Sequence, residues 1–380
     1  MKSREDEFFK VKKSRLGRLD ESLPFGVNII GYITAECGIG QISRGMIMAL
    51  KQAGVAISVY NFDIGWHRNA DNSVETFSDE LPYSINLCCF NADETPRRLS
   101  EIGAEKLKGK YNIGLWAWEL DSFPDEWKGA FEYVHEVWTI SDFAKKSIQK
   151  ATDLKVSKIP LLVEPIVDTK FNRTYFGISK DVYVFLFSFD GFSFADRKNP
   201  FATAAAYAAA FPSDSTMLII KTQNLDRSHE KKLHVILKGT QYRIINEYYA
   251  QEEFTGLLNS IDCYVSLHRA EGFGYGLAEA MYLKKTVIGT NYSGNLDFMD
   301  DTNSFLVPYK LVEIEKTVGP YKKGNHWADV DIEDAVKMMK KVYEDRDENY
   351  MREKQELAHA QIIKLYSSVS VANALKKLLK

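Results

Sequence analysis

Short hydrophobic runs rich in β-branched and aromatic residues alternate along the chain with longer stretches of helical periodicity. This alternation is typical of βαβ units and predicts parallel sheets covered by helices. The first series of predicted strands comprises Val27–Ile33, Ala56–Phe62, Ile85–Phe90, Tyr111–Trp116 and Glu136–Ile140. The second series comprises Tyr183–Phe189, Met217–Lys221, Tyr242–Asn246, Asp262–Leu267 and Thr286–Gly289. Each series predicts one doubly wound α/β domain.

The chain length supports two domains, because 380 residues exceed what one hydrophobic core usually covers. A polar stretch at 168–174 separates the two series of strands. We therefore expect a mixed-charge extension at 1–23, an N-terminal domain at 24–166 and a C-terminal domain at 167–358. Helical patterns over Asp331–Tyr343 and Asn349–Tyr366 follow the last strand, and residues 359–380 form the final segment.

The chain carries 49 basic and 52 acidic residues, and this near balance argues against binding of nucleic acid. Its four cysteines lack zinc-ligand spacing, so we expect buried, reduced thiols. Residues 1–23 contain no apolar core, which predicts neither a signal peptide nor a membrane span and favours a cytoplasmic location. The mixed-charge N-terminus and the segment Ala374–Lys380 leave peripheral attachment to the cytoplasmic face of the inner membrane as a hypothesis, with a packed last helix as the alternative.

One turn is the most informative part of the sequence. It joins the apolar run at 263–267 to a helical pattern beginning at Leu277, and it contains two carboxylates, Glu271 and Glu279, with three glycines between them. A helix N-terminus favours anionic or polar ligands, and glycines let the backbone approach a ligand. Eight residues of helix span about 12 Å, which exceeds the spacing of a glycosidase carboxylate pair. The turn therefore predicts a grip on two ends of a long ligand such as a nucleotide sugar.

With this motif, Glu-Gly-Phe-Gly followed at the eighth position by a second Glu, the chain resembles the retaining glycosyltransferases of the GT-B fold (family 4, or group 1, type). The resemblance implies two Rossmann-like domains facing a cleft, with a C-terminal helix that crosses back to the first domain. It also implies that Glu271 contacts the transferred sugar and that Glu279 contacts the ribose. The chain looks most similar to bacterial mannosyl- and rhamnosyltransferases of surface-polysaccharide synthesis, such as those that use GDP-mannose in lipopolysaccharide O-antigen assembly.

Other strand-end loops complete the predicted donor site, because ligands of open α/β sheets bind beyond the carboxyl ends of the strands. Gly38 and Gly40 follow the first strand and would let backbone amides approach the diphosphate, with a plain tight turn as the alternative. By resemblance, Lys198 neutralises the donor phosphates, and Arg197 substitutes for an arginine that relatives carry where this chain has Ser193. A solvated charge pair is the alternative for these two cations.

The loop at 292–297 contributes Gly294 and Asn295, whose amides would contact phosphate, unless the loop is a purely structural turn. In the first domain, Trp118 and Glu119 would bind the acceptor, with a core aromatic as the alternative for the tryptophan. Relatives place a histidine in this region and this chain does not, so either Glu119 or His268 is a candidate for its role, although a structural histidine is the alternative for His268. The predicted donor-binding set is Gly38, Gly40, Arg197, Lys198, His268, Glu271, Gly272, Phe273, Gly274, Glu279, Gly294 and Asn295. The predicted catalytic set is Glu271, Lys198, Arg197 and Glu119.

These features predict a retaining glycosyltransferase that moves a hexose, with mannose or rhamnose favoured, from a nucleotide-diphosphate sugar to a saccharide or lipid-linked saccharide acceptor. The resemblance implies that the leaving phosphate helps to deprotonate the attacking hydroxyl. No Asp-x-Asp pair lies in a convincing strand-end context, so we expect neither a metal nor another cofactor. The alternative is a catalytically inactive nucleotide-sugar-binding subunit of a glycosyltransferase complex.

Overall fold

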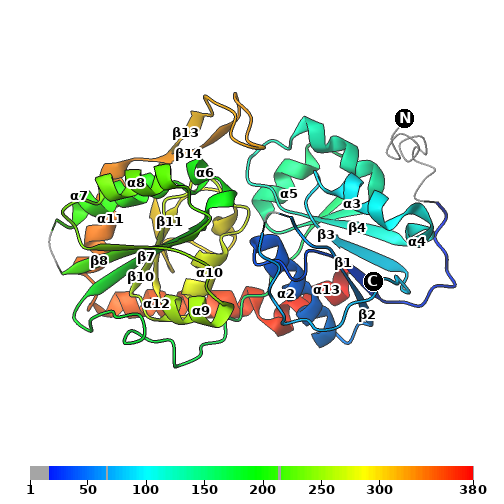
Figure 1. The fold of residues 1–380 in the computed structure, drawn as a ribbon, viewed down its shortest axis with the longest axis horizontal. Coiled ribbons are helices and arrows are strands. Elements are labelled where there is room, and N and C mark those ends of the chain that lie inside the picture. Colours follow the sequence, from blue (N-terminus) through cyan, green and yellow to red (C-terminus); the bar gives the residue numbers. More distant parts are fainter. Residues whose placement is uncertain (1–16, 66, 213–214, 380) are drawn as a thin grey trace. The chain divides into compact units, whose positions relative to one another are not determined.

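The computed structural model describes residues 17–65, 67–212 and 215–379 (Figure 1). Residues 1–16 of the predicted extension, and Lys380 of the predicted final segment, lie outside the described residues. The described chain divides into two compact units. Unit 1 extends to Leu162 and resumes at Tyr366, whereas unit 2 comprises Val163–Leu365. The boundaries expected from the sequence, after residues 166 and 358, differ from this division by a few residues.

Unit 1 is built around a six-stranded parallel sheet with the order β2-β1-β3-β4-β5-β6. Its strands are β1 (Val27–Gly31), β2 (Ile57–Asn61), β3 (Ile85–Cys89), β4 (Tyr111–Trp116), β5 (Glu136–Thr139) and β6 (Lys155–Lys158). Its helices are α2 (Gly38–Gln52), α3 (Thr95–Ile102), α4 (Ala104–Leu107), α5 (Asp142–Gln149) and α13 (Ser368–Leu378), with a 3-10 helix at Asp125–Tyr133. Helices α2 and α13 pack together on one face of the sheet, and α3 and α5 lie on the other (Figure 1).

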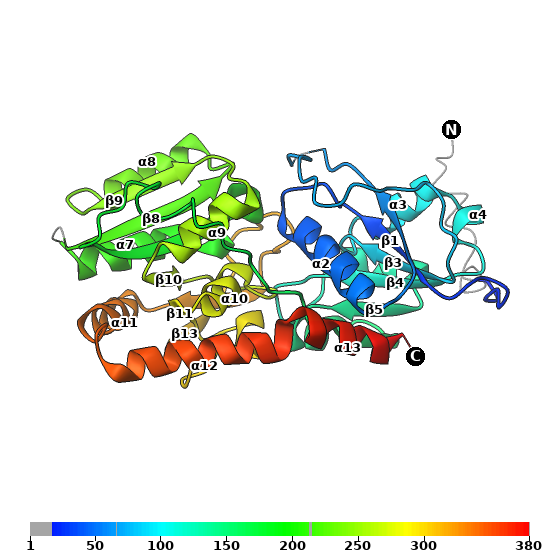
Figure 2. The same cartoon turned by 90° about the horizontal axis from the view of Figure 1, so that it is seen from below.

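Unit 2 contains a second six-stranded parallel sheet with the order β12-β11-β10-β7-β8-β9. Its strands are β7 (Tyr183–Asp190), β8 (Thr216–Gln223), β9 (Tyr242–Asn246), β10 (Cys263–Ser266), β11 (Thr286–Thr290) and β12 (Phe305–Val307). Its helices are α6 (Ala195–Lys198), α7 (Pro200–Ala210), α8 (Arg227–Ile236), α9 (Gln251–Asn259), α10 (Tyr275–Tyr282), α11 (Ile332–Glu344) and α12 (Asn349–Tyr366). A separate antiparallel ribbon pairs β13 (Tyr309–Glu313) with β14 (His326–Val330). Figure 2 shows α12 running past α10 before the chain reaches α13.

All ten predicted strands are present, with ends that shift by a few residues, and the doubly wound α/β architecture is confirmed. Strands β6 and β12 are absent from the predicted set, because they contain only four and three residues and are too short to leave a clear pattern. The ribbon is also absent from the predicted set of strands. Four of the five residues of β13 are exposed, so this strand contributes little to a hydrophobic core.

The cores of both units consist of strand residues sealed by helices. In unit 2, Phe185, Leu218, Val265 and Ile288 are fully buried within one cluster that also takes in residues of α7 and α11. All four cysteines are free, as predicted, and Cys88, Cys89 and Cys263 are buried. Among the described helices, none is long and apolar enough to cross a membrane.

A ladder of three buried asparagines crosses the sheet of unit 1. Asn28, Asn86 and Asn112 stand in register on β1, β3 and β4. The Asn28 amide donates to Asn86 Oδ1 at 2.8 Å, and the Asn86 amide donates to Asn112 Oδ1 at 2.8 Å. The Asn28 amide also donates to Tyr83 O at 2.8 Å, and Tyr83 N donates to Asn28 Oδ1 at 3.1 Å. The ladder satisfies polar groups that would otherwise be buried without partners.

We expect Asn86→Ala to lower the free energy of unfolding of unit 1 by about 3 kcal/mol, because it removes the side chain that bonds both the Asn28 amide and Asn112 Oδ1 within the buried sheet. Urea denaturation followed by circular dichroism measures this. The matched control is Asn72→Ala, which removes an exposed side chain of the same unit and should change stability by less than about 0.5 kcal/mol. Equal effects of the two substitutions would show that the ladder does not stabilise the sheet.

Candidate functional site

The loops that follow β7 and β10 meet in unit 2, because these two strands are neighbours in the sheet although they are far apart in the sequence. This is the point where the strand order reverses, and ligands of such sheets bind there. Between α6 and α7, Asn199 adopts a left-handed conformation (φ 57°) and donates its side-chain amide to Leu267 O at 3.0 Å. The bond ties the two loops together and fixes the place of the preceding Lys198.

Glu271 follows β10 at this point and is only 7% exposed. Lys198 Nζ lies 2.5 Å from its Oε1, and Arg197 Nη1 lies 3.3 Å from its Oε2. Arg197 is itself buried, and its Nη1 also donates to Ala270 O at 2.8 Å. The structure therefore brings three of the four residues of the predicted catalytic set into one ion cluster, in which Arg197 and Glu271 are buried and Lys198 is partly buried. Glu119, the fourth, belongs to unit 1.

The cluster determines the protonation of Glu271. Burial alone would raise the pKa of this carboxyl, but the positive charges of Lys198 and Arg197 outweigh burial and lower the pKa to about 2. Glu271 is therefore ionised throughout the neutral range. It can accept hydrogen bonds from hydroxyl groups, but it is a poor proton donor and a poor base near pH 7.

The motif around Glu271 is not helical throughout. Helix α10 begins only after Gly274, its N-cap, which has a positive φ of 98°. Glu271 precedes the helix, whereas Glu279 lies inside it and is 5% exposed. The helical separation assumed from the sequence therefore does not apply to this carboxylate pair. Phe273 turns its ring onto Phe298, with 5.1 Å between centroids, so its backbone is the part left to meet a ligand.

The loop after β11 packs directly against the Glu271 loop. Ser293 Oγ accepts a hydrogen bond from Glu271 N at 2.8 Å, and Gly294 N donates to Glu271 O at 2.9 Å. A Cβ at Gly294 would lie 2.1 Å from Gly272 O, so only glycine fits there. The Gly294 amide, which the sequence analysis assigns to phosphate, donates to the backbone of Glu271 in this structure.

His268 and Asn295 are fully buried and face each other. His268 Nε2 lies 3.1 Å from Asn295 Oδ1 and 3.3 Å from Tyr292 O, while its Nδ1 lies 3.1 Å from Ser266 Oγ. Since the Asn295 amide donates to Thr290 O, the groups facing Nε2 are acceptors, and Nε2 carries the proton. Burial lowers the pKa of His268 and keeps its ring neutral near pH 7. Both side chains support the loop, as the structural alternative for His268 expects. The predicted phosphate contact of the Asn295 backbone amide stays a prediction.

In unit 1, α2 begins at the predicted glycine loop. Gly38 is its first residue, and a Cβ there would meet no atom within 4 Å. Gly40 differs, because a Cβ there would lie 2.2 Å from Ala35 O. Gly38 therefore leaves open space beside the helix N-terminus, whereas Gly40 is required by the packing of the turn.

Trp118 lies in the core of unit 1 and is 1% exposed. Its ring packs edge-on against Trp127 at 4.9 Å and Phe123 at 6.3 Å, and its Nε1 donates to Ser122 O at 2.8 Å. The predicted stacking of this ring on an acceptor sugar is therefore wrong, and the core alternative is correct. Glu119 is half-buried beyond β4 and keeps its place as a candidate for acceptor contact.

A polar network at the reversal point of the unit 1 sheet was missed by sequence reasoning. Tyr32, just beyond β1, donates to Glu94 Oε2 at 2.6 Å, and Arg98 Nε donates to the Tyr32 hydroxyl at 2.8 Å. The Arg98 guanidinium also lies 4.8 Å from the centroid of the Phe62 ring. Burial and Glu94 raise the pKa of Tyr32, so the phenol stays protonated. The sequence signal is the i,i+4 spacing of Glu94 and Arg98, which is common on exposed helices and therefore uninformative.

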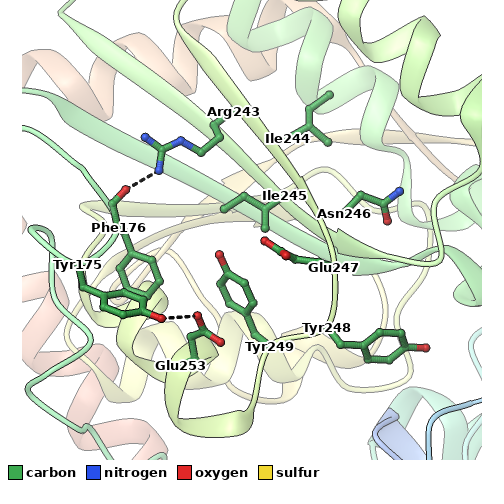
Figure 3. Close-up of a pocket in the computed structure, with 10 residues that line it drawn as sticks. All are labelled: Tyr175, Phe176, Arg243, Ile244, Ile245, Asn246, Glu247, Tyr248, Tyr249 and Glu253. Atoms are coloured by element: carbon green, nitrogen blue, oxygen red, sulfur yellow. Dashed lines mark hydrogen bonds between the residues drawn. The ribbon is translucent and has the colours of Figure 1, made fainter.

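A hollow of about 560 Å³ lies along β9, the edge strand of unit 2 (Figure 3). Arg243 donates to Phe176 O, and the Tyr175 hydroxyl donates to Glu253 at 3.0 Å. The hollow is lined by Tyr175, Phe176, Arg243, Ile244, Ile245, Asn246, Glu247, Tyr248, Tyr249 and Glu253. None of the predicted site residues lines it. Within the described part of the chain, no cluster of His, Cys, Asp and Glu could hold a metal ion.

Acidification is expected to weaken the folded state through Glu271. A carboxylate whose pKa falls from 4.5 to about 2 on folding stabilises the protein above pH 4.5, and this contribution is lost as the pH falls toward 2. We expect Glu271→Gln to lower the free energy of unfolding at pH 7 by about 3 kcal/mol, and its difference from wild type to shrink below about pH 4.5. Urea denaturation at several pH values tests this, and a difference that does not change with pH would contradict the ion cluster.

The chain is similar to known proteins in sequence over one segment and in fold over most of its length. Residues 220–358 match the family model of glycosyl transferases group 1. A search of curated proteins finds no match. A solved glycosyltransferase from Rickettsia africae is similar at a TM-score of 0.68 and 14% identity, covering 94% of this chain and 98% of that one. HepE from Anabaena, solved with UDP and glucose, is similar at a TM-score of 0.66 and 13% identity, covering 93% of this chain and 99% of that one. Sucrose-phosphate synthase from Thermosynechococcus elongatus is similar at a TM-score of 0.68 and 12% identity, covering 93% of this chain and 98% of that one. These likenesses establish the GT-B fold, and the match over residues 220–358 supports assignment to the glycosyltransferases.

Proposed function

We propose that the protein is a retaining glycosyltransferase that transfers a hexose from a nucleotide-diphosphate sugar to a saccharide or lipid-linked saccharide, without a metal ion. The observation that carries the proposal is the ion cluster of Lys198, Arg197 and Glu271 where the β7 and β10 loops meet. Two cations at this point suit a diphosphate, and a permanently ionised carboxylate between them suits the hydroxyls of a sugar.

The charges of the cluster match the charges that such a transfer develops. When the bond between the sugar C1 and the phosphate oxygen breaks, negative charge grows on the leaving diphosphate, and Lys198 and Arg197 are the cations placed to stabilise it. The acceptor hydroxyl forms the new bond to C1 on the same face, and its proton passes to the leaving phosphate. Glu271 does not take this proton, because its pKa of about 2 makes it too weak a base.

The ion cluster also predicts what donor binding must change. Lys198 Nζ already bonds Glu271, so a phosphate must share this ammonium or draw it away. The position of Arg197 beside the same carboxylate supports its proposed substitution for the arginine missing at Ser193. Gly38 in unit 1 and Glu279 in α10 remain proposed contacts of the phosphate and the ribose, and Glu119 a proposed contact of the acceptor.

The identity of the sugar is a narrower proposal. Mannose and rhamnose donors are favoured by the sequence resemblance, while the solved structure of HepE contains UDP and glucose. The panel of donors should therefore include both kinds of nucleotide. A cytoplasmic location, assembly of surface polysaccharide and association with other glycosyltransferases belong to the same proposal.

Nucleotide release from a donor panel tests the proposal directly. We expect release from one of GDP-mannose, GDP-rhamnose, dTDP-rhamnose, UDP-glucose and UDP-N-acetylglucosamine, and we expect EDTA to leave the rate unchanged. The anomeric configuration of the product, read by NMR, should match that of the donor. Loss of activity in EDTA would reject metal independence. Binding of a donor with no release and no transfer would favour the catalytically inactive binding subunit.

Substitutions separate the proposed roles within the cluster. Lys198→Ala should weaken donor binding about 100-fold, because it removes a cation from the phosphates. Glu271→Ala should lower kcat about 100-fold with a smaller change in KM. Lys170→Ala is the matched control, since Lys170 is an exposed lysine of the same unit that pairs with Asp168. Wild-type kinetics in the first two variants, or equal losses in the control, would reject the assignment.

A further inference from the structure

The ribbon of β13 and β14 belongs to neither large sheet, yet it contacts the loops that build the candidate donor site. It spans residues 309–330, and its two strands are joined by the segment 314–325 (Figure 1). Most residues of β13 are exposed, and Leu311 is 54% accessible. Two aromatic residues are buried, Tyr321 in the joining segment and Trp327 in β14, which are 3% and 6% exposed.

Tyr321 packs against the loop that carries Arg197. Its ring centroid lies 5.8 Å from Arg197 Cζ, within the range of a cation–π contact. Its ring also meets Phe194 edge-on, with 5.6 Å between centroids. A Cβ at Gly319 would lie 2.2 Å from the Phe194 ring, so the ribbon approaches this loop as closely as a glycine allows.

Trp327 packs in the same way against Arg269, two residues before Glu271. The Arg269 guanidinium lies 5.3 Å from the centroid of one Trp327 ring, and its Nε pairs with Asp329 at 2.9 Å. The backbone of Arg269 accepts a hydrogen bond from Ala328 N at 2.9 Å. Three ribbon contacts therefore hold Arg269: the Trp327 ring, the Asp329 carboxylate and the Ala328 backbone amide.

Arg269 in turn connects the two donor loops. Its N–H donates to Arg197 O at 2.8 Å, and its Nη1 donates to Asp196 O at 3.0 Å. The ribbon also reaches the loop after β11, because the rings of Tyr309 and Tyr292 lie 4.9 Å apart. All three unit 2 loops around Glu271 are thus in contact with the same ribbon.

We propose that Tyr321 and Trp327 are positioning residues of the diphosphate grip, by which we mean the cations Arg197 and Lys198. Tyr321 holds Arg197 directly, and Trp327 holds it through Arg269. This inference rests on the proposed function. Arginine side chains lose conformational freedom when they bind an anion, and a guanidinium already held between an aromatic ring and a carbonyl loses less. The ribbon therefore increases affinity for phosphate without contacting it.

Titration with inorganic pyrophosphate, followed by calorimetry, measures the grip without requiring the donor to be known. We expect Tyr321→Leu to weaken pyrophosphate binding roughly fivefold, the effect of losing one cation–π contact. Tyr321→Phe keeps the ring and should stay within about twofold of wild type. With the donor identified by the panel, Tyr321→Leu should raise KM by a similar factor and change kcat less.

The matched control is Tyr350→Leu. Tyr350 lies at the start of α12, and its ring centroid is 5.4 Å from Lys341 Nζ. This substitution should leave pyrophosphate binding unchanged. Asp329→Asn gives a second route to the same effect, because it releases Arg269 at a partly exposed position where loss of the fold is not expected. It should also weaken pyrophosphate binding.

Three outcomes would overturn the inference. Equal pyrophosphate affinity in wild type, Tyr321→Leu and Asp329→Asn would show that the ribbon does not position the grip. Equal losses in Tyr321→Phe and Tyr321→Leu would assign the effect to the hydroxyl and reject the ring contact. If wild type binds neither pyrophosphate nor any donor of the panel, the proposed function itself fails, which is distinguishable from a ribbon without effect.

Discussion

The carboxylate of Glu271 is the constraint on which the rest of the site depends. A carboxylate with 7% exposure is strongly destabilising unless cations and hydrogen bonds replace the water that it has lost. Lys198 and Arg197 supply the charge, and they can do so only because β7 and β10 are neighbours although 73 residues separate Lys198 from Glu271. The topology of the sheet therefore brings the charges together, and the charges in turn fix the loops.

Most of the polar groups around this carboxylate act on the backbone. Ser293 and Gly294 bond the backbone N–H and C=O of Glu271, and Asn199 bonds the backbone of Leu267 at the end of β10. His268 and Asn295 form a buried pair beneath them. The backbone around Glu271 is therefore fixed before a ligand arrives, and preorganised sites stabilise developing charge at little reorganisation cost.

Strand positions and the strand-end motif could be predicted because they depend on local patterns, namely alternation of apolar runs and the spacing of glycines and carboxylates. What the side chains face could not be predicted in the same way. His268, Asn295 and Trp118 have the residue types of ligand contacts, but they point into the interior, and direction depends on the packing of the whole unit. The ribbon escaped prediction because the five residues of β13 mix apolar and charged side chains without clean alternation, while its buried rings, Tyr321 and Trp327, stand outside any regular period.

The path of the chain has a consequence for biosynthesis. Unit 2 is one continuous stretch, whereas unit 1 is completed by α13, whose buried residues Val371, Ala372 and Leu375 pack in the unit that contains α2. During synthesis on the ribosome, the apolar face of α2 therefore lacks its packing partner α13, which is synthesised more than 300 residues later. The unit that is made first is finished last, and until then it is an incomplete domain of the kind that chaperones protect from aggregation.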